Sequence, residues 1–147
     1  MDNILSSLTA NNGFVAPMLA MVFLTMIVWF YMYYRRLSYV FANKIKPQAL
    51  DNPTKRAILP DDVNNVAYNF VNLFEMPILF YVLCGLFIMT GSGDQLSLAF
   101  AWGFVATRAV HSFIQCTYNK VIHRFYIYSL GSFLLFALVI KAATLML

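Results

Sequence analysis

The sequence has few charged residues and many apolar ones. Of its 147 residues, 11% are charged and 61% are hydrophobic, and only six are Asp or Glu. A soluble domain of this size needs far more polar surface to cover its core. The composition therefore excludes a soluble globular protein and indicates a membrane protein.

Motifs that carry metal or nucleotide chemistry are also missing. The chain has two cysteines, Cys84 and Cys116, and it contains no C-x-x-C pair, H-E-x-x-H motif, Gly-rich phosphate loop or Walker sequence. The expected heights of the two thiols in the membrane differ by roughly 20 Å, which is too far for a disulfide within one subunit. We expect apolar packing for both thiols, no metal site and no nucleic-acid partner.

Long apolar stretches fill most of the chain. Each can cross a hydrocarbon core of about 30 Å, which takes about 20 helical residues. The sequence predicts one all-α membrane domain over residues 1–147, a bundle of four transmembrane helices with spans at about 14–41, 63–90, 95–119 and 122–146. The first stretch is expected to be a span and not a cleaved signal peptide, because no Lys or Arg precedes it.

Basic residues indicate the orientation in the membrane. With four spans, the 1–2 and 3–4 connections lie on one side and both termini lie on the other. Eight of the ten Lys and Arg residues fall in or beside these two connections: Arg35, Arg36, Lys44, Lys46, Lys55, Arg56, Lys120 and Arg124. The positive-inside rule predicts that both connections are cytoplasmic and both termini outside. Because residues 42–62 contain three prolines among charges, we expect a loop there rather than a helix.

Polar residues inside the apolar stretches follow helical spacing. The stripes are Tyr68, Asn72 and Glu75 in the second span, Arg108, His111, Gln115 and Asn119 in the third, and Arg124 and Tyr128 in the fourth. Counting 1.5 Å per residue places Glu75, Arg108 and His111 at a similar depth. An isolated charge at mid-bilayer costs about 2.5–3.5 kcal/mol, so we expect a Glu75–Arg108 contact. Pro77 cannot donate to the Leu73 carbonyl, which predicts a kink beside Glu75.

Together the stripes predict a polar funnel open to the cytoplasm, with Arg35 and Arg124 near its mouth and Glu75 at its floor. Polar residues in membrane bundles can also serve only to join helices. The stripes have more donors and acceptors than one helix contact needs, which favours a binding site. The funnel suits an anionic ligand with an ammonium group, beside a lipophilic reactant. Glutathione and an electrophile dissolved in the membrane have this chemistry.

Two stretches resemble a known family. "NLFEMPILFY" and "RAVHSFIQCTYNKVIHRFYIY" are similar to the MAPEG family, membrane-associated proteins in eicosanoid and glutathione metabolism, and most to its bacterial members. The resemblance covers nearly the whole chain, and its most specific parts are N-x-x-E in the second span and R-x-x-H with a downstream Arg. It implies a homotrimer in the bacterial inner membrane, in contact with membrane lipids. It also implies glutathione as co-substrate, bound between neighbouring subunits.

Matching positions imply roles for individual residues. Asn72 and Glu75 would hold the backbone and amino group of glutathione, and Arg35 one of its carboxylates. Arg124 would be catalytic and stabilise the glutathione thiolate, since a fixed guanidinium lowers the pKa of a nearby thiol. The remaining residues implied to bind glutathione are Arg108, His111, Gln115 and Tyr128.

The sequence departs from the family pattern at four positions. Tyr68 stands where an arginine is usual, Gln115 where a tyrosine is common, and Pro77 comes one residue early. Phe125 replaces the serine of prostaglandin E synthases, which argues against that isomerase chemistry. Three functions stay open. The chain could be a glutathione transferase or peroxidase acting on lipophilic electrophiles or lipid hydroperoxides, used in detoxification. It could be a non-catalytic lipid-binding or scaffold member. The third and least favoured function is a small drug exporter, because such a protein would need its glutamate in the first span and Glu75 is in the second.

Overall fold

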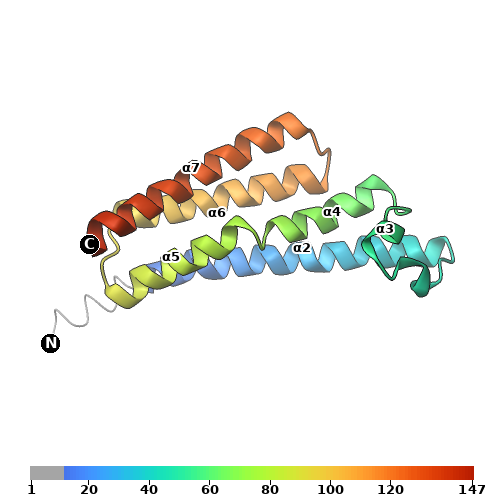
Figure 1. Cartoon of the computed structure of the whole chain (residues 1–147), viewed down its shortest axis with the longest axis horizontal. Helices are drawn as coiled ribbons and strands as arrows, with labels where there is room; N and C mark the ends of the chain where they lie inside the picture. The colour runs from blue at the N-terminus through green and yellow to red at the C-terminus, as the bar shows by residue number, and fades with distance from the viewer. Residues whose placement is uncertain (1–11) are drawn as a thin grey trace.

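The apolar stretches form long helices that lie side by side. The computed structural model describes residues 12–147, and this part of the chain contains helices and no strand. The helices are η1 (Asn12–Phe14), α2 (Val15–Ala42), η2 (Pro47–Leu50), α3 (Pro53–Arg56), α4 (Asp61–Asn72), α5 (Met76–Thr90), α6 (Gln95–Cys116) and α7 (Val121–Met146). In Figure 1, α2 runs beside α4 and α5, and α6 runs beside α7. The start of α2 and the end of α7 lie at one end of the bundle, and α3 lies at the other.

Within residues 12–147, three segments are long and apolar enough to cross a membrane. They are α2 with 28 residues, the Asp61–Thr90 segment with 30, and α7 with 26. Large apolar side chains such as Phe23, Phe30, Phe133 and Ile140 are exposed on the outside of the bundle, where lipid would surround them. The chain is therefore an all-α membrane protein. Helix α6 has 22 residues and includes Arg108 and His111. That α6 also crosses the membrane, as the third of four spans, stays a prediction.

The second long segment is broken beside Glu75. Helix α4 ends at Asn72 and α5 begins at Met76, and Figure 1 shows the irregular stretch between them. Pro77 lies in the first turn of α5, where its missing N–H removes no helical hydrogen bond. The kink predicted from Pro77 is confirmed. It is a full interruption of the helix, and it exposes the Glu75 side chain.

The connection between α2 and α4 is more ordered than a plain loop. Residues 42–62 include the short helices η2 and α3, so the expectation of no helix there was wrong in detail. Both begin with a proline in the first turn, and the Asn52 side chain caps α3 by accepting from the Lys55 N–H. A small apolar cluster of Val40, Leu59 and Val63 holds the connection against α2 and α4.

The core is built from stacked aromatic rings and small residues. Phe80 of α5 stacks on Phe104 of α6 with ring centroids 4.9 Å apart, and both side chains are fully buried. Helices α6 and α7 approach closely at Gly131, where a Cβ would lie 2.7 Å from the hydroxyl of Thr107. Only glycine fits at such a contact, as is common where membrane helices pack. Near this contact, Arg108, the residue after Thr107, lies beside Tyr128, three residues before Gly131.

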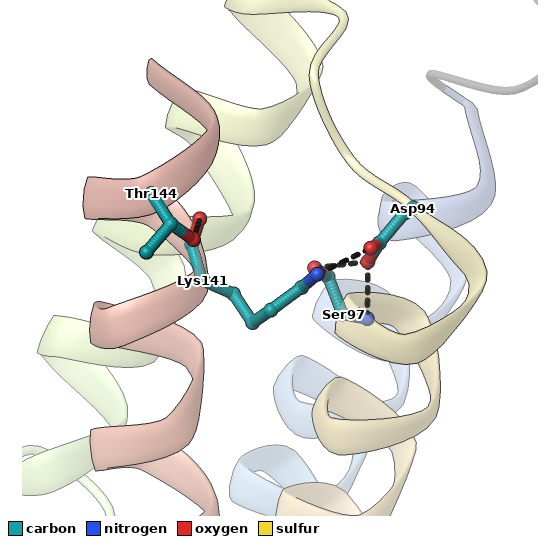
Figure 2. Close-up of polar contacts among 4 residues, drawn as sticks. All are labelled: Asp94, Ser97, Lys141 and Thr144. Atoms are coloured by element: carbon teal, nitrogen blue, oxygen red, sulfur yellow. Dashed lines mark hydrogen bonds and ion pairs between the residues drawn. The ribbon is translucent and has the colours of Figure 1, made fainter. Parts of the chain in front are cut away.

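An ion pair joins α6 and α7 at the end of the bundle away from α3. Asp94 caps α6 by accepting from the Ser97 N–H at 2.8 Å, and it also receives a hydrogen bond from Lys141 of α7. Figure 2 shows the Lys141 side chain reaching across to Asp94 and Ser97. The carboxylate therefore has two separate roles, as a helix cap and as half of a link between helices.

Two substitutions at Asp94 separate these roles. Asp94→Ala removes the cap and the ion pair, and we expect the free energy of unfolding to fall by about 1 kcal/mol from the cap alone. Asp94→Asn keeps an oxygen that can cap α6, so we expect a smaller loss that disappears at high salt. Denaturant unfolding of the detergent-solubilised protein measures both. Equal losses in the two variants would show that the cap contributes nothing.

Stability should also depend on pH through Asp94. The hydrogen bond from Lys141, followed by those from Ser97, holds the pKa of the Asp94 carboxyl well below its ordinary value. A lowered folded-state pKa stabilises the fold above the unfolded pKa of about 3.9, and that stabilisation is lost as the pH falls through the folded-state value. We therefore expect the stability difference between wild type and Asp94→Asn to shrink below about pH 4. A difference that stays constant from neutral to acid pH would contradict this.

Candidate functional site

A hollow lined by both polar and apolar side chains lies between α6 and α7, beside the last residue of α4, at the end of the bundle nearer α3. Its volume is about 220 Å³, and we call it the α6–α7 hollow. It is lined by Asn72, His111, Val121, Arg124, Phe125 and Tyr128. Four of the predicted site residues, Asn72, His111, Arg124 and Tyr128, are thus brought together from three helices.

Arg124 lies in the first turn of α7 and is held by the preceding turn. Its Nη1 donates to the side-chain oxygen of Asn119 at 2.6 Å. Asn119 has a φ of 48°, a left-handed conformation that asparagine tolerates better than most residues, and its N–H donates to the Ile114 carbonyl at 2.8 Å. The turn between α6 and α7 therefore orients the Arg124 guanidinium at the hollow, while leaving its other N–H groups available.

Arg108 is buried behind this hollow. It is 1% exposed, and among the described residues none of its three guanidinium nitrogens has a hydrogen-bond partner. Its Cζ lies 5.0 Å from the centre of the Tyr128 ring, a distance suited to a cation–π contact. His111, one turn further along α6, is 3% exposed with its ring 5.8 Å from the same tyrosine. Tyr128 therefore contacts both buried basic residues of α6.

Amide and hydroxyl groups join α4 to α6 beside the hollow. Asn72 donates to the Gln115 side chain at 2.9 Å, and Gln115 is 2% exposed. One turn earlier, Asn69 accepts from the Ser112 hydroxyl at 3.2 Å and donates to Cys116 at 3.4 Å. The sequence analysis missed Asn69 and Ser112. Helical spacing could have found them, because Asn69 lies three residues before Asn72 and Ser112 three residues before Gln115, so each continues a polar face.

Four of the eight predicted site residues do not line the α6–α7 hollow: the buried Arg108 and Gln115, and also Glu75 and Arg35. Glu75 is exposed at the helix break and makes no direct ion pair with Arg108 within one chain, so the predicted contact is not formed as a salt bridge, although the carboxylate is near enough for its charge to act on the guanidinium. Arg35 pairs with Asp62 at the start of α4 and donates to the Tyr31 hydroxyl at 3.0 Å. Arg35 thus already has an anionic partner, which the sequence analysis did not foresee.

The charge of the hollow favours an anion. Arg124 lines it and Arg108 lies behind Tyr128, while none of its described lining residues is acidic. A guanidinium offers several N–H donors in a planar fork, which matches carboxylate, phosphate or thiolate groups. Within residues 12–147, no group of three His, Cys, Asp or Glu side chains could hold a metal ion. Val121 and Phe125, both more than half exposed, extend the wall toward the lipid side.

Comparison with known proteins supplies a family. The sequence model of the MAPEG family matches residues 14–144. The chain belongs to the MAPEG family. Members of this family include glutathione transferases and peroxidases as well as non-catalytic proteins. No curated protein and no solved structure matches the chain.

Within this MAPEG chain, two of the departures from the family pattern are at the surface. Tyr68 is 59% exposed and lies outside the α6–α7 hollow. Phe125 lines the hollow and is 60% exposed, so it adds an apolar wall where a serine would add a hydroxyl. Gln115 is buried and hydrogen-bonded to Asn72, and it joins helices where a tyrosine would present a phenol.

The unpartnered guanidinium of Arg108 leads to a stability prediction. A buried charge without a partner costs several kcal/mol, so Arg108→Met, which keeps a long apolar side chain, should raise the stability of the protein without ligand by roughly 1–3 kcal/mol. Reversible unfolding in mixed micelles measures this, with the polar-to-apolar change Gln115→Met as the control, which is expected to destabilise. A loss of stability in Arg108→Met would show that a partner satisfies Arg108 in the assembled protein.

Proposed function

We propose that this protein is a membrane-bound, glutathione-dependent transferase or peroxidase that acts on lipophilic electrophiles or lipid hydroperoxides. The observation that supports it most directly is the α6–α7 hollow, in which Arg124 lies beside apolar walls and next to buried basic residues. The guanidinium suits the anionic co-substrate. The exposed rings of Phe125 and Tyr126 at the start of α7 suit a second reactant that arrives from the lipid.

In this proposal Arg124 stabilises the thiolate of glutathione. A free thiol has a pKa of about 8.5, and an adjacent cation lowers it, so more of the nucleophilic form is present at neutral pH. The proton goes to solvent. In the transferase reaction the sulfur forms a bond to an electrophilic carbon, and the leaving group departs with the electron pair. In the peroxidase reaction the sulfur attacks the peroxide oxygen, an S–O bond forms as the O–O bond breaks, and the leaving alkoxide takes a proton from solvent, which gives an alcohol and the sulfenic acid of glutathione. A second glutathione then forms the disulfide and releases water.

The other predicted residues position the tripeptide. Asn72, Gln115, His111 and Tyr128 offer donors and acceptors around the hollow, and Arg108 supplies a buried positive charge behind it. Glu75 and Arg35 lie outside the hollow of their own chain. We propose that the protein is a homotrimer, as MAPEG proteins generally are, and that these residues bind glutathione across the interface with a neighbouring subunit. The exposed apolar faces of α2 and α5 are available for that interface.

We further propose four membrane spans, with α6 as the third. Both basic connections would face the cytoplasm and both termini the outside, in a bacterial inner membrane. The α6–α7 turn, which includes Lys120 and leads into Arg124, is near the same end of the bundle as Arg36 and Arg56 of the α2–α4 region. This common location supports a single cytoplasmic face, by the positive-inside rule.

A non-catalytic, lipid-binding role is the second candidate. Tyr68 occupies the position where the family resemblance leads us to expect an arginine, and its side chain is 59% exposed. A protein that lacks this cation has one anchor fewer for glutathione. A lipid-binding member would use the apolar surfaces of the bundle and would not need the thiolate chemistry.

Glutathione binding discriminates between the two. We expect the wild-type protein in detergent to bind glutathione in calorimetry, with a thiolate absorbance that rises at lower pH than for free glutathione. Arg124→Ala should abolish the thiolate signal, because the guanidinium that lowers the thiol pKa is gone. Lys120→Ala removes a cation from the adjacent turn outside the hollow and should leave the signal unchanged. Absence of binding by the wild type would reject the enzyme and favour the lipid-binding role.

Assembly is tested separately. We expect native mass spectrometry of the protein released from detergent to show a trimer of 16.8 kDa chains. We expect Glu75→Gln to weaken glutathione binding in that trimer, because Glu75 would contact the ammonium group of the ligand. A monomer or dimer, or unchanged binding in Glu75→Gln, would contradict a site shared between subunits.

A further inference from the structure

A second cationic hollow lies beside α4, at the end of the bundle that carries α3. Its volume is about 260 Å³, and we call it the Arg36–Arg56 hollow. It is lined by Arg36, Pro53, Arg56, Ala57, Asn64, Ala67, Tyr68 and Val71. It shares no lining residue with the α6–α7 hollow. The proposed function therefore leaves it without a role.

Two guanidinium groups meet here without a described counter-charge. Arg36 and Arg56 line the same hollow, none of its described lining residues is acidic, and like charges at this range repel each other. The nearby carboxylates of Asp51 and Asp62 are engaged elsewhere, with Lys55 and Arg35. Among the described residues, the buried Nε of Arg36 has no hydrogen-bond partner. An anion in the hollow would satisfy both arginines.

The wall around Arg56 is held in place by its own backbone contacts. Arg56 donates from Nε to the Leu50 carbonyl at 3.2 Å, which fixes its side chain against η2. Asn64, 8% exposed, donates to the Leu59 carbonyl at 2.9 Å and to the Arg56 carbonyl at 3.3 Å. These bonds join α3 to the first turn of α4. The two terminal nitrogens of Arg56 are left to face a ligand from a fixed backbone.

The depth and the walls of the hollow indicate what the anion is attached to. Arg36 lies six residues before the end of α2, which is about 9 Å along the helix axis, and it is half-buried. This is the level at which long basic side chains reach the headgroup region. The remaining lining includes Ala67, Val71 and Tyr68, and Val71 and Tyr68 are more than half exposed.

We propose that the Arg36–Arg56 hollow binds the phosphate of an anionic phospholipid. The two guanidinium forks receive the phosphate oxygens, the Tyr68 hydroxyl donates to the headgroup, and the acyl chains lie along the exposed apolar face of α4. Arginine is well suited to this role, because its planar fork binds phosphate with two parallel hydrogen bonds. In this proposal the exposed Tyr68 side chain contacts the lipid headgroup, a role that does not depend on glutathione.

Lipid retention in native mass spectrometry tests the proposal. The full-length protein is exchanged into mixed micelles with equal amounts of phosphatidylglycerol and phosphatidylcholine, and the ratio of the two bound lipids is measured. We expect the wild type to retain phosphatidylglycerol preferentially. Arg36→Gln and Arg56→Gln should each lower that preference about fivefold or more, since each removes charge-assisted hydrogen bonds. Arg36→Lys should fall between, because it keeps the charge and loses the fork.

Lys55→Gln is the matched control. Lys55 neighbours Arg56 in α3, is exposed and lies outside the hollow. We expect its variant to keep the wild-type preference, and an equal loss in Lys55→Gln would overturn the proposal in favour of general surface charge. Arg56 lies in a four-residue helix of the connection, so Arg56→Gln remains informative if Arg36→Gln does not fold.

Two competition experiments, with inorganic phosphate and with glutathione, show whether the hollow binds a phospholipid, a free oxyanion or glutathione. Inorganic phosphate at millimolar concentration should not displace the bound phosphatidylglycerol, because it lacks the acyl chains. Displacement by phosphate would show a site for free oxyanions and overturn the lipid assignment. Displacement by glutathione would show that the hollow belongs to the thiol site and would overturn it as well. Failure of glutathione to bind anywhere would reject the proposed enzyme without affecting the lipid result.

Discussion

The close contact between α6 and α7 at Gly131 is the constraint on which the α6–α7 hollow depends. Because Gly131 has no side chain, the α7 backbone rests against Thr107, and Tyr128 comes within reach of Arg108 and His111 one turn away. A larger residue at position 131 would separate the two helices and move Tyr128 away from both basic residues. The electrostatic character of the hollow therefore depends on a packing contact between Gly131 and Thr107, although neither residue lines the hollow.

Much of the site could be predicted from spacing alone. Arg108, His111 and Gln115 recur at helical intervals, so one face of α6 had to carry all three, and Asn72 was expected to meet them from the second span. The helix break followed from Pro77. The position of Glu75 could not be predicted in the same way, because an interrupted helix no longer keeps its residues on one stripe. The pairing of Arg35 with Asp62, 27 residues away, depends on how the connection folds, and sequence spacing does not encode it.

Helix α4 contributes residues to two hollows with different walls. Asn72, the last residue of α4, meets amide, imidazole and phenol groups, which suit a polar molecule that binds from water. Tyr68 and Val71 lie beside two arginines and are exposed. Both sites suit an anionic group. They differ in what that group is attached to, which in our proposals is a polar peptide in the α6–α7 hollow and hydrocarbon chains in the Arg36–Arg56 hollow. Helix α4 takes part in both, and it ends at Asn72, before the break that precedes α5.

The ion pair between Arg35 and Asp62 adds an internal competitor for any ligand that Arg35 binds. Asp62 is largely exposed, with 63% of its side chain accessible, so the pair can open into water at little cost, but it must open before a foreign carboxylate takes its place. The apparent affinity of such a ligand is its intrinsic affinity multiplied by the fraction of molecules in which the pair is open. Salt weakens the internal pair and the external one together, so the affinity would vary less with ionic strength than the charge of the arginine suggests. Every incoming anion that binds Arg35 must therefore compete with Asp62 for the guanidinium.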